Sequence, residues 1–139
     1  MNIDKYIILI FSLLFPALSF ADQEASNRPH VVASEWGGCY AKSVPDESYG
    51  QKGTTKVYNV KANEDELVTT HDWYSGQIYL HCNVSDSKGN SGISTVRLGP
   101  WQRGREVNKD DLAIAFYLND KLLKRYSTLD IAQEQKNAS

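Results

Sequence analysis

Hydrophobic and polar residues alternate in short runs over most of this chain, and turn-forming residues separate the runs. From residue 30 to about residue 128, stretches rich in Val, Thr, Tyr, Ile and Leu lie between clusters of Gly, Pro, Asn, Asp and Ser. Short alternating runs at this spacing predict an all-β antiparallel fold of about seven or eight strands, as a meander, sandwich or small barrel. The candidate strands are residues 30–34, 39–44, 54–61, 67–73, 77–82, 94–98, 112–118 and 121–127.

The clearest hairpin covers residues 112–127. Its Asn-Asp pair at 119–120 tolerates the positive φ angles that a two-residue turn requires. The turn predicts two cross-strand pairs, Tyr117 with Leu122 and Phe116 with Leu123. Apolar pairs then lie on both faces, which suggests a strand covered on both sides. A helix is the competing interpretation of the first strand, because Leu, Ala and Phe accept either structure.

A second hairpin is predicted over residues 67–82, with a Ser-Gly turn at 75–76. This turn sets Trp73 opposite Ile78 and His71 opposite Leu80, and Leu67, Thr69 and Cys82 share the same apolar inner face. Tyr79 and His81 point to the other face. The apolar face fixes the register, because a slip of one residue would expose it.

The two cysteines, Cys39 and Cys82, are predicted to form a disulfide. Their spacing is not that of a CxxC redox motif, and alternation places both side chains on inner faces, Cys39 beside Ala41. Two buried free thiols are the alternative. A disulfide requires an oxidising compartment, so this prediction depends on export.

Residues 1–21 have the pattern of a cleavable signal peptide. A polar head carrying Lys5 precedes the nearly all-apolar run of residues 6–14, and the small residues Ser19 and Ala21 fit a signal peptidase site. The apolar stretch is shorter than the roughly 20 residues that span a membrane. We therefore expect no stable membrane span after processing, and a periplasmic or secreted protein; an uncleaved anchor helix is the alternative.

The rest of the chain divides into a flexible leader, a single β domain and a frayed tail, at residues 22–29, 30–132 and 133–139. A Ser-Thr-Leu-Asp sequence at 127–130 resembles a capping box that opens a short helix, to about residue 135. The length suits one modest core. The formal net charge of −2 gives the chain no general reason to bind nucleic acid or an anionic membrane.

No catalytic residue, metal site or cofactor is predicted. The histidines are His30, His71 and His81, and the second hairpin points the last two to opposite faces, whereas zinc needs three or four converging ligands. Residues 86–92 resemble a calcium loop only in part, because Lys88 stands where an oxygen ligand belongs. The acidic clusters fall in predicted loops, and the chain contains no nucleophile elbow or phosphate loop.

The most suggestive stretch for binding is residues 97–109. It concentrates Arg97, Arg103 and Arg105 around Trp101 in a loop that contains Gly and Pro. Arg and Trp are frequent anchors of interfaces, and a basic loop suits an acidic protein or an anionic polysaccharide. The competing interpretation is a solvated loop with Trp101 packed as a lid on the core.

We therefore expect an exported, non-enzymatic binding or accessory module whose partner is an unknown protein or an anionic polysaccharide. The alternatives are a small envelope hydrolase or metal-dependent enzyme, and a structural component of envelope assembly. A pocket with converging ionisable groups would favour the enzyme, and an exposed aromatic and basic patch would favour binding. Long unpaired edge strands would favour assembly.

Overall fold

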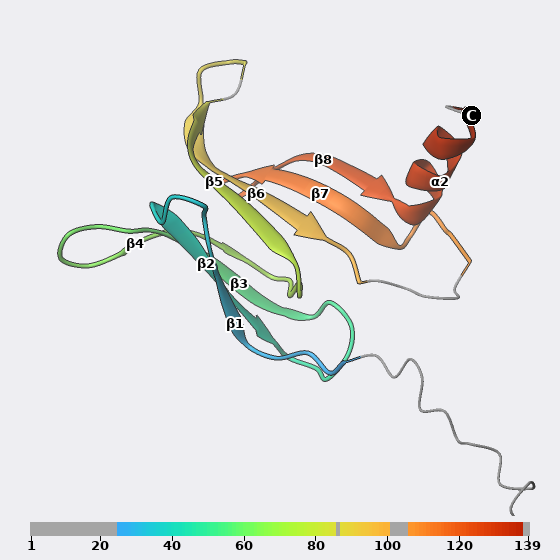
Figure 1. Cartoon of the computed structure of the whole chain (residues 1–139), viewed down its shortest axis with the longest axis horizontal. Coiled ribbons are helices and arrows are strands. Elements are labelled where there is room, and N and C mark those ends of the chain that lie inside the picture. The colour runs from blue at the N-terminus through green and yellow to red at the C-terminus, as the bar shows by residue number, and fades with distance from the viewer. Residues whose placement is uncertain (1–24, 86, 101–105, 138–139) are drawn as a thin grey trace, which may run out of the picture.

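The computed structural model describes residues 25–85, 87–100 and 106–137. It confirms the all-β antiparallel class: eight strands form two four-stranded sheets that do not close into a barrel. Figure 1 shows the two sheets and the helix that follows the last strand. The first sheet has the order β1 (His30–Ala33), β2 (Cys39–Pro45), β3 (Gly53–Asn59), β4 (Glu66–His71). The second has the order β5 (Ile78–Ser85), β6 (Ser91–Leu98), β7 (Leu112–Leu118), β8 (Lys121–Ser127).

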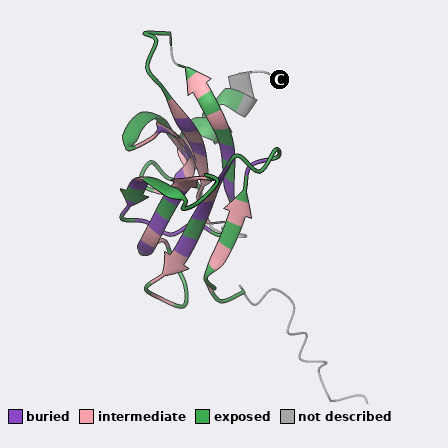
Figure 2. Ribbon diagram, turned by 90° about the vertical axis from the view of Figure 1, so that its left-hand side faces the viewer, coloured by how far each residue is buried: buried purple, intermediate pink, exposed green. Residues whose placement is uncertain are grey.

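Alternation along β2 and β3 builds the inner face of the first sheet. Cys39, Ala41 and Ser43 of β2 are buried, and they pair in register with residues 55–59 of β3, where Val57 is fully buried. Figure 2 shows buried residues alternating with exposed ones along the strands. The core between the sheets is completed from the second sheet, mainly by Leu80, Ile78 and Ile93.

The predicted disulfide is confirmed. Cys39 of β2 and Cys82 of β5 are bonded, with their Cα atoms 5.9 Å apart. Because β2 and β5 belong to different sheets, the bond links the two layers of the sandwich directly.

The predicted hairpin over residues 67–82 is wrong. β4 pairs with β3, and β5 pairs with β6, so the connection at 72–77 crosses from one sheet to the other. The inward orientation of His71, Trp73, Ile78 and Leu80 is nevertheless as predicted, since all four are buried. The predicted inward orientation of Leu67 is wrong: a bulge between Val57 and Tyr58 places Leu67 opposite Tyr58 on the outer face, where it is 50% exposed. Both strands face the same core from opposite sheets, and alternation alone does not distinguish this arrangement from a hairpin.

Hydrogen bonds from distant parts of the chain hold the crossover connection in place. The Thr55 hydroxyl donates to the Trp73 carbonyl at 2.7 Å, and the Tyr74 amide donates to the Gln51 carbonyl at 2.8 Å. The Ser75 hydroxyl lies 2.7 Å from the Leu98 carbonyl of β6. These bonds satisfy the polar groups of a connection that would otherwise be buried without partners.

The hairpin at 112–127 is confirmed as two strands joined at 119–120, where Asn119 adopts a φ of +50°. Tyr117 lies opposite Leu122 as predicted, but Phe116 lies opposite Lys124, because a bulge shifts the register between residues 116 and 117. β7 is buried or half-buried along its whole length, in agreement with a strand covered on both sides. In β8, by contrast, residues 121–125 are exposed.

The helix α2 (Thr128–Asn137) begins at the predicted capping box. The Asp130 amide donates to Ser127 Oγ at 3.1 Å, and the Ser127 amide and hydroxyl donate to Asp130 Oδ2 at 2.7 and 2.8 Å. These bonds lower the pKa of the Asp130 carboxyl. Within the described ranges, no helix is long and apolar enough to cross a membrane.

Candidate functional site

Of the four residues predicted to contact a partner, only Arg97 lies among the described residues. Trp101, Arg103 and Arg105 lie outside the described residues. Arg97 lies in β6, with its side chain half-buried and its guanidinium carbon 4.6 Å from the centroid of the Trp73 ring. Its Nη2 donates to Gln51 Oε1 at 2.6 Å. Arg97 therefore ties β6 to the crossover connection and to the loop between β2 and β3.

Arg97 belongs to a cluster of rings between the sheets. The imidazole of His71 stacks on Trp73 with centroids 4.8 Å apart, and Tyr117 contacts both rings, at 4.9 Å from His71 and 5.6 Å from Trp73. Burial lowers the pKa of His71, and the nearby charge of Arg97 lowers it further, against the opposite effect of Asp72. His71 is therefore held as a neutral ring that packs the two sheets together.

Several polar atoms in this layer have no hydrogen-bond partner among the described residues: His71 Nε2, Trp73 Nε1, Thr95 Oγ1 and Arg97 Nε. Two of them, Trp73 Nε1 and Arg97 Nε, can only donate. Nowhere in the described part of the chain do three or more His, Cys, Asp or Glu side chains gather closely enough to hold a metal ion.

The most exposed large hydrophobic side chain of the described chain is Trp36, at 90% exposure. It lies in the turn between β1 and β2, residues 34–38, which we call the tryptophan turn. An indole ring carries a large apolar surface whose exposure is unfavourable. A nearly fully exposed tryptophan buries little apolar surface and therefore contributes little to the stability of the fold.

The main chain of the tryptophan turn is fixed at several points. The Ser34 amide donates to the Cys39 carbonyl at 2.9 Å, and the Gly37 amide donates to the Ser34 carbonyl at 3.0 Å. Gly37 has a φ of +69°, a conformation that glycine adopts without strain. The turn therefore closes on itself immediately before the disulfide-bonded Cys39.

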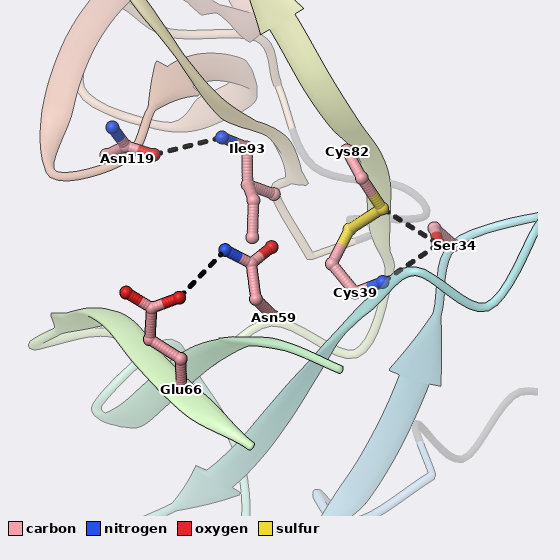
Figure 3. The surroundings of a disulfide bond; sticks show 7 residues. All are labelled: Ser34, Cys39, Asn59, Glu66, Cys82, Ile93 and Asn119. Carbon is pink, nitrogen blue, oxygen red and sulfur yellow. Dashed lines mark hydrogen bonds between the residues drawn. A yellow bond between two sulfur atoms is a disulfide. The ribbon is translucent and has the colours of Figure 1, made fainter. Parts of the chain in front are cut away.

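Side chains anchor the same turn to the disulfide, as Figure 3 shows. Ser34 Oγ accepts a hydrogen bond from the Cys39 amide at 3.4 Å, and its hydroxyl donates to Cys82 Sγ at 3.1 Å. Gly38 lies against Cys82, because a Cβ atom at this position would be 3.5 Å from the sulfur. The Gly38 carbonyl also accepts the Val60 amide at 3.0 Å. Trp36 is thus presented by a turn that is bonded to both sheets.

Beside the turn, the outer face of the first sheet carries a row of apolar side chains. Tyr40 and Tyr58 lie directly opposite each other, with their rings stacked at 4.9 Å, and Leu67 of β4 continues the row. The Tyr40 hydroxyl donates to Asp65 Oδ2 at 3.0 Å. Burial and this hydrogen bond, in that order, raise the pKa of Tyr40. Leu67 is 50% exposed, so the row offers further apolar surface.

The end of the first sheet next to Trp36 is acidic. Glu35 of the turn and Glu64 and Asp65 of the loop between β3 and β4 are all exposed; we call these three residues the acidic rim. The next residue, Glu66, is neutralised by Lys61, whose Nζ lies 3.3 Å from Glu66 Oε2 and lowers the pKa of that carboxyl. The rim therefore adds three carboxylates to the surroundings of the exposed indole.

No protein-family model, curated protein or solved structure matches this chain.

Trp36 was not among the predicted site residues, although the sequence carries a signal for it. Trp36 precedes two glycines and a cysteine and falls in a predicted turn, where a large side chain has few neighbours. The prediction that Trp101 and the arginines form the contact surface remains a prediction.

Proposed function

We propose that this chain is an exported, non-enzymatic binding module that contacts a protein or polysaccharide partner through Trp36. The observation that carries the proposal is the 90% exposure of this ring on a turn fixed by hydrogen bonds and by a disulfide. The fixed main chain of this turn loses little conformational freedom on binding, and a tryptophan side chain has only two torsion angles to order. Tryptophan is among the residues that dominate binding energy in interfaces.

Export to the periplasm or the outside of the cell forms part of the proposal. The Cys39–Cys82 disulfide supports it, because disulfides persist in oxidising compartments and are rare in the cytosol. The signal-peptide pattern of residues 1–21 supports the same location from an independent part of the chain.

Capture from a cell-envelope extract tests the proposal. The immobilised protein is compared with Trp36→Ala and with the matched control Tyr79→Ala, which removes a ring that is 57% exposed on β5 of the other sheet. Captured protein and carbohydrate are both quantified. We expect the wild type and Tyr79→Ala to retain the same component. Trp36→Ala should bind it at least about 30-fold more weakly, the effect of losing about 2 kcal/mol at an interface anchor.

The thermal stability of all three proteins is measured in parallel. Because Trp36 has almost no contacts within the fold, Trp36→Ala should melt close to the wild type. Equal capture by the wild type and Trp36→Ala would show that Trp36 is not the contact, and the proposal would fail.

A further inference from the structure

We propose that the partner of the tryptophan turn is strand β8 of a second copy of this chain, so that molecules associate head to tail. This inference rests on the proposed function, because it uses the same exposed Trp36. It adds the identity of the partner and its contact surface, and it connects the binding module with an assembly role.

Strand β8 has the properties of an open docking edge. Among the residues that the structure describes, it is the last strand of its sheet and pairs only with β7, so no described strand occupies the other side of its main chain, which can contact another molecule. Its residues 121–125 are all exposed, and Leu122 and Leu123 are 49% and 47% exposed. Leu122 lies opposite Tyr117, whose ring contacts His71 and Trp73 between the sheets, so Leu122 projects from the inner face at the open edge of the sheet. Lys121 and Lys124 lie opposite Leu118 and Phe116 and project from the other face. An indole ring that docks at this edge can be buried against the half-exposed Leu122.

The charges of the two surfaces are opposite. The exposed part of β8 carries Lys121, Lys124 and Arg125 and no acidic residue, although Asp120 and Asp130 flank the strand. The tryptophan turn is bordered by the three carboxylates of the acidic rim. Complementary charges favour encounter and orientation, and they disfavour the pairing of two identical surfaces. Two β8 strands would place lysines against lysines, and two acidic rims would repel each other.

The two surfaces are too far apart to satisfy each other within one molecule. The tryptophan turn is bonded to β5 through the disulfide, and β8 lies three strands away from β5 in the second sheet. At the usual strand spacing this is about 14 Å. A contact between different patches of two copies is heterologous, and it extends into a chain or closes into a ring. The contact is small, which predicts a weak, salt-sensitive association.

Analytical ultracentrifugation of the disulfide-bonded protein tests the inference. The weight-average mass of the wild type should rise with concentration between about 10 µM and about 1 mM, the range of weak contacts. It should fall towards the monomer when NaCl is raised from about 50 mM to about 500 mM, because salt screens surface charges. A wild type that remains monomeric over the whole range overturns the inference.

Two variants that each block one surface make the test specific. Trp36→Ala removes the ring and keeps β8, whereas the double variant Lys121→Glu, Lys124→Glu reverses the charge of β8 and keeps the ring. Each should be monomeric alone, and an equimolar mixture should form a dimer that does not grow further. Association of either variant to the extent of the wild type, or a mixture that stays monomeric, contradicts the head-to-tail contact.

A matched control places the same charge reversal elsewhere. Lys42 and Lys56 are exposed and lie opposite each other on the outer face of the first sheet, and Lys42→Glu, Lys56→Glu should associate like the wild type. If this control abolishes association equally, general charge and not β8 is responsible, and the inference fails. A monomeric wild type whose capture of an envelope component still depends on Trp36 would overturn this inference and leave the proposed function intact.

Discussion

Replacing both cysteines by alanine removes the covalent link between the two sheets. Cys39 and Cys82 are 43 residues apart in the sequence. In the unfolded chain, a cross-link of this length removes conformational entropy equivalent to about 4 kcal/mol. Residual structure in the unfolded state reduces this figure. We therefore expect the variant Cys39→Ala, Cys82→Ala to lose about 2–4 kcal/mol of unfolding free energy.

The packing around the disulfide supports a value in this range. Cys39 is fully buried within the main hydrophobic cluster, and Cys82 packs against the same cluster. Truncating two sulfur atoms also removes the acceptor of the Ser34 hydroxyl. A domain of this size has a total stability of about 5–15 kcal/mol, so the melting temperature should fall by about 8–16 °C.

Urea unfolding followed by tryptophan fluorescence measures the change, and wild-type protein reduced with dithiothreitol provides the control. The reduced protein should match the double variant to within about 1 kcal/mol, because both lack the same cross-link. Amide exchange supplies a local readout, since Val60 donates to Gly38 in the tryptophan turn and its exchange should become faster. A double variant within about 1 kcal/mol of the oxidised wild type would refute the entropic argument.

Two further predictions concern the layer between the sheets and the crossover. Burial holds the pKa of His71 below its ordinary value of 6.5. The stability that the buried neutral ring contributes is therefore complete above pH 6.5 and is lost as the pH falls through the folded-state pKa. The urea midpoint should therefore decrease on acidification from pH 6.5, and His71→Phe should flatten this dependence; an unchanged pH profile in His71→Phe would contradict it. Gly53→Ala should cost about 2 kcal/mol or more, because its Cβ would meet the Val44 carbonyl oxygen and lie 2.8 Å from Tyr74 Cβ. Gly89→Ala is the control in thermal melts, since Gly89 also has a positive φ but no neighbour within 4 Å, and an equal loss in both variants would show that crowding at Gly53 is not the cause.

The strands could be predicted from the sequence because period-two alternation is a local property. The candidate strands at 112–118 and 121–127 agree with β7 and β8 to the residue, and the others agree to within a few residues. The crossover could not be predicted in the same way. Its hydrogen bonds to Thr55, Gln51 and Leu98 come from residues far away in the sequence, and no local pattern reports them.

The bulge in the last hairpin shows the same limit on a smaller scale. The turn at 119–120 fixes the first cross-strand pair, and Tyr117 lies opposite Leu122 as expected. The next pair depends on whether the strand keeps its regular hydrogen bonding. The register shift that brings Phe116 opposite Lys124 accompanies a β8 strand that is exposed along residues 121–125. An exposed strand lacks the buried face that would otherwise enforce the regular register.

Trp36 is the residue at which two sequence-based expectations conflict. Its side-chain type predicts burial, whereas its place before Gly37 and Gly38 predicts an exposed turn. The structure follows the turn, because the bonds of Ser34 and the disulfide of Cys39 fix the main chain on both sides of the ring. Neither constraint requires an indole ring. A small polar residue at this position would expose less apolar surface to water. The proposed contact with a partner would account for the ring, and unchanged melting of Trp36→Ala together with lost binding is the pair of results that distinguishes this proposal from a role in folding.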